Sequence, residues 1–205
     1  RYLRVRMLLR ARYSDAKIAL QYFHENVEQD PFLSSLGQAI AYERLHMVSK
    51  AKEAYAKAQK LKPEDPLLTR ELGIFNFKHG NFQLAAQYLQ KAVFEDPHDL
   101  MALFYYARMR TEMGDPGQAV DYYRRILKHI PEDAEVHYYL GRALGEDRKY
   151  FDAHLHLAYS ALYGRDMKKL RFHMDKAEHL ARTEEQEKQV KKFKDELQER
   201  REFWG

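Results

Sequence analysis

Residues 100–133 read LMALFYYARMRTEMGDPGQAVDYYRRILKHIPED, and this stretch gives the clearest indication of the fold. Its centre is Gly114-Asp115-Pro116-Gly117-Gln118. A glycine ends a helix readily, an aspartate caps the next one, and a proline fits the first helical turn. The Gln three residues after the Asp can complete a capping box. The stretch therefore predicts two antiparallel helices joined by a tight turn.

This hairpin recurs with a period of 34 residues. Three series of residues share the period: Pro63, Pro97 and Pro131; Ala51, Ala85, Ala119 and Ala153; and Ala39, Gly73, Ala107 and Gly141. Small side chains are needed where helices cross closely, and a proline stops the helix that precedes it. A second turn signal, Gly80-Asn81, fits the same scheme, with Gly ending one helix and Asn capping the next. The period predicts an array of stacked helical hairpins.

The two ends of the chain depart from the period, as terminal repeats usually do. The expected fold is all-α, with antiparallel helical hairpins stacked in chain order and a C-terminal capping helix. We expect three regions: a divergent N-terminal helical hairpin over residues 1–31, repeats over residues 32–165, and a closing helix followed by a charged capping helix over residues 166–205. The helix at residues 150–163 is expected to serve two neighbouring hairpins. Arginines among the first twelve residues are expected on a solvated side of a packed helix, with contact to anionic lipid or nucleic acid as the alternative.

The capping helix has its own sequence signature. Thr183-Glu184-Glu185-Gln186 is a capping-box pattern at its start. Its apolar residues recur at broadly helical spacing: Val190, Phe193, Leu197 and Trp204. We therefore expect this helix to seal the last hydrophobic face.

The small residues and prolines of the 34-residue period resemble the tetratricopeptide repeat. The resemblance implies a right-handed α-α superhelix, a solenoid that binds other protein segments. The family's frequent aromatic residue near the start of the first helix is absent, and its place is taken by Ser35, Thr69, Leu103 and His137. The identity of a partner therefore cannot be carried over from a better-matched member.

Composition and motifs argue against catalysis and nucleic-acid binding. Lys and Arg number 35 against 31 Asp and Glu, a formal net charge of +4, and the two signs are interspersed. The sequence has no cysteine, and no apolar run approaches the roughly 20 residues that span a bilayer. The nearest approach to a zinc-peptidase motif, His24-Glu25, lacks the second histidine. We predict no enzyme activity, no cofactor and no metal site in this segment. A metal cluster of His137, His154 and His173 is the alternative to ordinary packing and surface roles.

Equivalent positions on the first helices of a solenoid line its concave face. The predicted partner-binding groove consists of Leu36, Ile40, Arg70, Ile74, Phe77, Phe104, Arg108, Tyr138 and Arg142. Arg108 and Arg142 are one repeat apart and suit a carboxylate or backbone carbonyls, while Phe104 and Tyr138 offer apolar contact area. We favour a protein or peptide segment as the occupant. Docking of the protein's own neighbouring domain is the alternative, and helical-repeat RNA binding is least favoured because the net charge is small.

Other stretches resemble a more specific group. Tyr2-Leu3-Arg4-Val5-Arg6-Met7-Leu8-Leu9, Ala153-His154-Leu155-His156-Leu157-Ala158 and Arg171-Phe172-His173-Met174-Asp175-Lys176-Ala177 are similar to segments of bacterial periplasmic zinc metallopeptidases related to the beta-barrel assembly-enhancing protease. The resemblance implies the substrate-recruiting or regulatory C-terminal half of such a peptidase, acting in outer-membrane protein assembly or quality control.

Several expectations follow from this second resemblance. The partners would be the peptidase's own N-terminal catalytic domain or outer-membrane assembly factors. The location would be periplasmic, with a cytoplasmic location as the alternative. None of that family's catalytic residues falls in this sequence. Because the sequence starts with Arg rather than Met, we expect it to be part of a longer protein.

Overall fold

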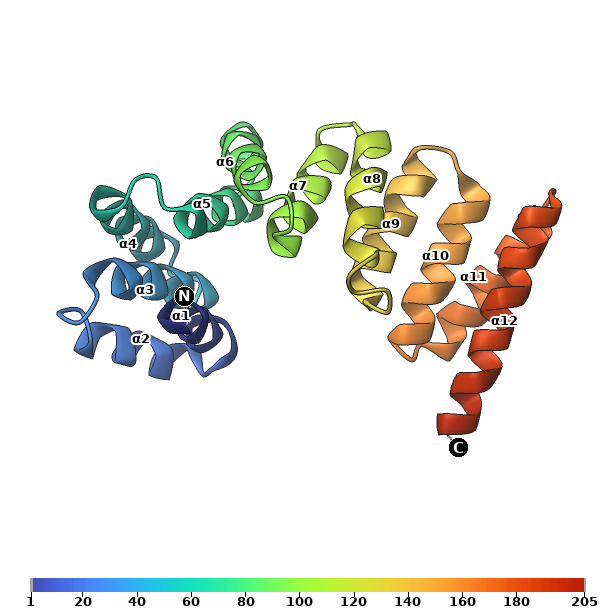
Figure 1. The fold of residues 1–205 in the computed structure, drawn as a ribbon, viewed down its shortest axis with the longest axis horizontal. Helices are drawn as coiled ribbons and strands as arrows, with labels where there is room; N and C mark the ends of the chain where they lie inside the picture. The colour runs from blue at the N-terminus through green and yellow to red at the C-terminus, as the bar shows by residue number, and fades with distance from the viewer. Residues whose placement is uncertain (1, 205) are drawn as a thin grey trace. The chain divides into compact units, whose positions relative to one another are not determined.

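The computed structural model describes the backbone of residues 2–204 and the side chains of residues 2–202, so the predicted role of Trp204 lies outside the described side chains. Within these residues the structure contains twelve α-helices and no strand, which confirms the predicted all-α class (Figure 1). The chain divides into two compact units, residues 1–75 and residues 76–205.

Each unit consists of helices that follow one another closely in sequence. The first unit holds α1 (Tyr2–Tyr13), α2 (Ala16–Glu25), α3 (Pro31–Arg44), α4 (Val48–Leu61) and most of α5 (Pro66–Lys78). The second unit holds the end of α5, α6 (Phe82–Glu95), α7 (Leu100–Glu112), α8 (Pro116–Leu127), α9 (Ala134–Glu146), α10 (Tyr150–Tyr163), α11 (Met167–Leu180) and α12 (Glu184–Trp204).

Sequential neighbours pack against each other within each unit. In the second unit α6 contacts α7, α7 contacts α8, and α8 contacts α9. Helix α10 packs against both α9 and α11, as expected for a helix that serves two neighbouring hairpins. Helix α12 contacts α10 and α11, and its Phe193 is fully buried there. The hairpins of the second unit are therefore stacked in chain order, and α12 covers the last of them.

The small residues of the 34-residue period lie at the helix crossings. Ala39, Ala51, Ala85, Ala107 and Ala119 are fully buried. The crossing of α9 and α10 is too close for any side chain, because a Cβ atom on Gly141 would lie 2.7 Å from Leu157 Cγ and 3.0 Å from the Ala153 carbonyl oxygen. The period thus reflects backbones that approach closely enough to exclude larger side chains.

A left-handed residue follows the first helix of successive hairpins. Gly80 and Gly114 have φ angles of 75° and 82°, as expected for helix-ending glycines. His46 and Arg148 occupy the same place 34 residues away on either side, with φ angles of 58° and 61°. A side chain in this conformation is strained by about 1–2 kcal/mol, so these two turns are less favourable than the glycine turns.

The expected helix caps are present in part. The Asp115 side chain accepts a hydrogen bond from the Gln118 backbone N–H (3.3 Å), as predicted, whereas the Asn81 side chain makes no cap and instead donates to Asn76 Oδ1 (3.3 Å). At α12, Thr183 Oγ1 accepts from the Gln186 N–H (3.2 Å). Over the described residues, no helix combines the length and apolar character required to cross a bilayer.

Candidate partner-binding site

In the first unit, the N-terminal helix α1 covers helices that were predicted to line the groove. Helix α3 contacts α1, α2 and α4, and residues 32–41 of α3 are all buried. Leu36 is 0% exposed, Ile40 3% and Ile74 1%. These three predicted groove residues therefore have no surface with which to touch a partner. Leu36 and Ile40 are buried because α1, α2 and α4 all pack against α3.

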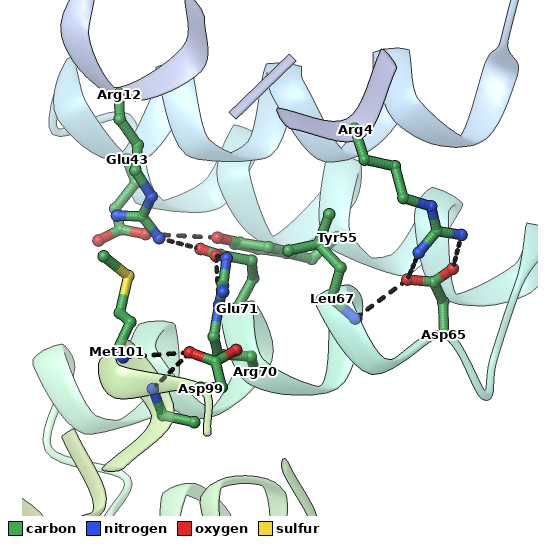
Figure 2. A network of polar contacts seen from close by, with 11 residues as sticks. Arg4, Arg12, Glu43, Tyr55, Asp65, Leu67, Arg70, Glu71, Asp99 and Met101 are labelled. Atoms are coloured by element: carbon green, nitrogen blue, oxygen red, sulfur yellow. Dashed lines mark hydrogen bonds and ion pairs between the residues drawn. The ribbon is translucent and has the colours of Figure 1, made fainter. Parts of the chain in front are cut away.

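Two ion pairs tie α1 to the region of α5 (Figure 2). Arg4 donates to both carboxylate oxygens of Asp65, and Arg12 Nη2 lies 2.5 Å from Glu71 Oε2. Arg70, another predicted groove residue, approaches the other oxygen of Glu71 with Nη2 at 2.8 Å, and its side chain is only 13% exposed. The expectation of a solvated arginine side on the first helix is therefore wrong for Arg12, whose side chain is 18% exposed.

Glu71 is the buried centre of this network, and its side chain is 2% exposed. Burial by itself raises the pKa of Glu71, but the charges of Arg12 and Arg70 and their hydrogen bonds outweigh burial, so the pKa lies below its usual value. Arg12 Nε is buried without a hydrogen-bond partner, so this guanidinium is satisfied mainly through Glu71. The arrangement holds α1 in place by charges that would be costly to separate.

The second unit presents a different surface, centred on Arg108 of α7. Its guanidinium carbon lies over four aromatic rings, at 4.2 Å from the ring centre of Tyr139, 5.0 Å from Phe77, 5.6 Å from Tyr105 and 5.8 Å from Phe104. These rings come from the end of α5, from α7 and from α9, which are the first helices of successive hairpins. The set fixes the guanidinium plane by cation–π contacts.

Arg142 of α9 lies beside this set. Arg108 and Arg142 line the same small depression, together with Tyr123 and Tyr139. Arg142 is accessible, with its side chain 46% exposed and its Nη2 3.4 Å from Glu146 Oε1, an exposed pair of little energetic weight. Burial raises the pKa of Tyr123, so this phenol stays neutral at the base of the depression.

The other predicted groove residues of the second unit are placed as follows. Tyr138 is 44% exposed, Phe104 is half-buried, and Phe77 is buried at 7% exposure beneath Arg108. Tyr105 and Tyr139 were not among the predicted residues, although they too are 34 residues apart. The period itself could have identified them.

The histidines considered for a metal site are separated into two pairs. His137 Nδ1 lies 3.0 Å from His156 Nδ1, and His154 Nδ1 lies 3.0 Å from His173 Nδ1. The alternative cluster of His137, His154 and His173 is therefore not assembled. Within the described residues, no three or more His, Asp or Glu side chains converge in a way that could hold a metal ion.

Comparisons with known proteins agree with this architecture. Two family models, both described as tetratricopeptide repeat, match residues 36–99 and residues 76–138. A search of curated protein sequences finds no match.

Several solved structures share the fold. MamA of AMB-1 has a TM-score of 0.65 at 18% identity, covering 80% of this chain and 99% of its own. YrrB, described as a TPR protein with an unusual peptide-binding site, has a TM-score of 0.61 at 22% identity, covering 77% and 82%. PilF of Pseudomonas aeruginosa has a TM-score of 0.61 at 17% identity, covering 95% of each chain. The predicted solenoid class is thereby confirmed, and this chain is a tetratricopeptide-repeat protein whose matched repeats run from residue 36 to residue 138.

Proposed function

We propose that this protein is an interaction scaffold that binds a segment of another protein on the second unit, at the surface formed by Arg108, Arg142, Tyr138 and Tyr139. The observation that carries the proposal is the guanidinium of Arg108, fixed among aromatic rings beside the accessible Arg142. The described peptide-binding site of YrrB, which has the same fold, supports a peptide as the occupant.

The recognised feature is a carboxylate next to an apolar side chain. A guanidinium with a fixed plane can donate two parallel hydrogen bonds to one carboxylate, and less ordering entropy is lost when its orientation is already set. Tyr138, with 44% of its surface exposed, and the half-buried Phe104 offer contact area for an apolar neighbour of that carboxylate. The first unit contributes less, because α1 already covers α3 and Glu71 holds Arg70.

The test uses two labelled peptides of one sequence, each ending in Asp-Phe, one with a free C-terminal carboxylate and one amidated. Binding to the full chain is followed by fluorescence anisotropy. Arg142→Glu should weaken binding of the free-acid peptide by about tenfold or more, equivalent to roughly 1.4 kcal/mol. Arg201→Glu is the matched control, because it makes the same charge change at an exposed residue of α12 that lines no described pocket.

A second variant separates charge from geometry. Arg108→Lys keeps the positive charge but loses the planar fork, so it should also weaken free-acid binding while leaving the helical circular dichroism unchanged. Equal binding of the two peptides to the wild type, or undiminished binding to Arg142→Glu, would show that this surface does not recognise a carboxylate.

We further propose that the chain is the substrate-recruiting or regulatory part of a periplasmic zinc metalloendopeptidase that acts in outer-membrane protein assembly or quality control. One structural observation supports this reading. Two of the segments that resemble such peptidases form one helical hairpin, α10 and α11, and meet at the contact between His154 and His173. The reading frame upstream of Arg1 tests the proposal: it should encode H-E-x-x-H on a helix and an export signal, and a frame with neither removes it.

A further inference from the structure

One cavity of the second unit lies on a different surface from the Arg108 site, beneath α12. It has a volume of about 810 Å³, within the usual range for ligand pockets. Its floor consists of His137 from α9 and of Tyr159 and Tyr163 from α10. Its walls come from α12 and from the segment between α8 and α9.

The floor is aromatic and uncharged. Tyr159 and Tyr163 stack with ring centres 5.9 Å apart and planes 25° apart, and the His137 ring lies 5.2 Å from Tyr159 and 5.3 Å from Tyr163. Burial lowers the pKa of His137 and outweighs the opposite effect of the hydrogen bond that its Nε2 donates to the Pro131 carbonyl oxygen (2.9 Å), so the ring is neutral near pH 7. Three aromatic rings without a positive charge are attractive to a cation.

The walls carry an excess of negative charge. Six charged residues line the cavity, namely the acidic Glu132, Asp195, Glu196 and Glu199 and the basic Lys192 and Arg200. Among the described side chains, Asp195 and Glu199 form no ion pair, and both are exposed at the rim. Two carboxylates are therefore available to a ligand that enters.

The protein already holds one cationic side chain in this way. Arg200 lies with its guanidinium carbon 4.8 Å from the Tyr163 ring centre. It donates to Glu196 Oε1 at 3.2 Å and pairs with Glu132 Oε1 at 2.8 Å, while the Tyr163 hydroxyl donates to the same Glu196 oxygen at 2.9 Å. An aromatic face and flanking carboxylates thus stabilise a guanidinium in the cavity, and the aromatic ring of Tyr159 and the carboxylates of Asp195 and Glu199 line the same cavity.

We infer that this cavity is a second peptide site, which takes a lysine or arginine side chain of a partner protein over Tyr159, with Asp195 and Glu199 as counter-charges. The site has the opposite charge preference to the Arg108 surface. The two together would let one scaffold distinguish a basic segment from an acidic one.

The test measures binding of three blocked, labelled peptides to the full chain: Gly-Lys-Arg-Lys-Gly, Gly-Asn-Gln-Asn-Gly and Gly-Glu-Asp-Glu-Gly. Only the basic peptide should bind at this cavity. Asp195→Asn with Glu199→Gln should weaken its binding about tenfold or more. Glu185→Gln with Glu202→Gln is the matched control, with the same charge change on α12 at exposed residues outside the cavity, and should change binding less than about twofold.

Two further variants define the mode of binding. Tyr159→Phe keeps the aromatic ring and should retain most of the affinity, whereas Tyr159→Leu removes the ring and should lose it. Arg142→Glu on the other surface should leave basic-peptide binding unchanged, so the two sites can fail independently. Equal losses in the cavity variant and in its α12 control would overturn the inference in favour of general attraction to an acidic helix. Equal binding of the basic and neutral peptides to the wild type would overturn it as well.

Discussion

The buried carboxylate of Glu71 gives the sharpest stability prediction, and the perturbation is Glu71→Gln. The side chain is 2% exposed and lies between Arg12 and Arg70, which are 18% and 13% exposed. The amide has nearly the same shape but no charge, so the poorly solvated guanidinium of Arg12 would lose its ion-pair partner.

The magnitude follows from the burial of the three groups. Removing one partner from a buried ion pair costs about 3–5 kcal/mol, because the remaining charge is left without compensation. Domains of this kind are stable by only about 5–15 kcal/mol, so the loss is a large share of the total. The matched exposed change, Glu146→Gln at the Arg142 pair, should cost less than about 0.5 kcal/mol, because both side chains are more than 40% exposed.

The assay is urea unfolding at pH 7 followed by circular dichroism, with amide hydrogen exchange of α1 as a local readout. Glu71→Gln should lower the unfolding midpoint strongly and speed exchange in α1, because Arg12 is held chiefly by Glu71. Adding Arg12→Met should recover more than about 1 kcal/mol relative to the sum of the single changes. A Glu71→Gln protein within about 1 kcal/mol of wild type, with unchanged exchange in α1, would refute the reasoning about this network.

Three more predictions concern single residues. Arg148→Gly should stabilise the protein by roughly 1 kcal/mol in thermal unfolding, because the φ of 61° strains a side chain, and a lower melting temperature would contradict this. Gly141→Ala should destabilise by about 1 kcal/mol or more, since the contact of 2.7 Å with Leu157 outweighs the better helix propensity of alanine; a gain in stability would show that Leu157 yields freely. The lowered pKa of Glu71 means that the unfolded chain binds a proton more readily than the folded one, so wild type should lose more stability than Glu71→Gln as pH falls from 5 to 3. Parallel pH profiles would remove that explanation.

Much of the fold could be predicted from sequence because its cause is local and repeated. Close helix crossings demand Ala or Gly at fixed positions, and Gly141 against Leu157 shows why. The expected bounds of α10, residues 150–163, coincide with those observed. His46 and Arg148 were missed as left-handed residues, because histidine signals that conformation only weakly and arginine does not signal it.

Residues of the candidate site could be predicted only at positions that recur every 34 residues. Arg108 and Arg142 lie at one depression because they occupy the same position in successive hairpins. The covering of α3 by α1 has no such signal, because the ion pairs that hold α1 join residues about 60 apart that share no repeat position. Nothing in the pattern distinguished Arg12, which pairs with a buried carboxylate, from the other arginines of the first helix.

The most direct test of the binding proposal is to observe the side-chain Nε–Hε resonances of Arg108 and Arg142 by NMR during titration with the free-acid Asp-Phe peptide. The account predicts that both resonances shift along one binding curve, and that the amidated peptide moves them far less. If the peptide binds while both resonances stay in place, the carboxylate is recognised elsewhere, and the assignment of this surface is contradicted.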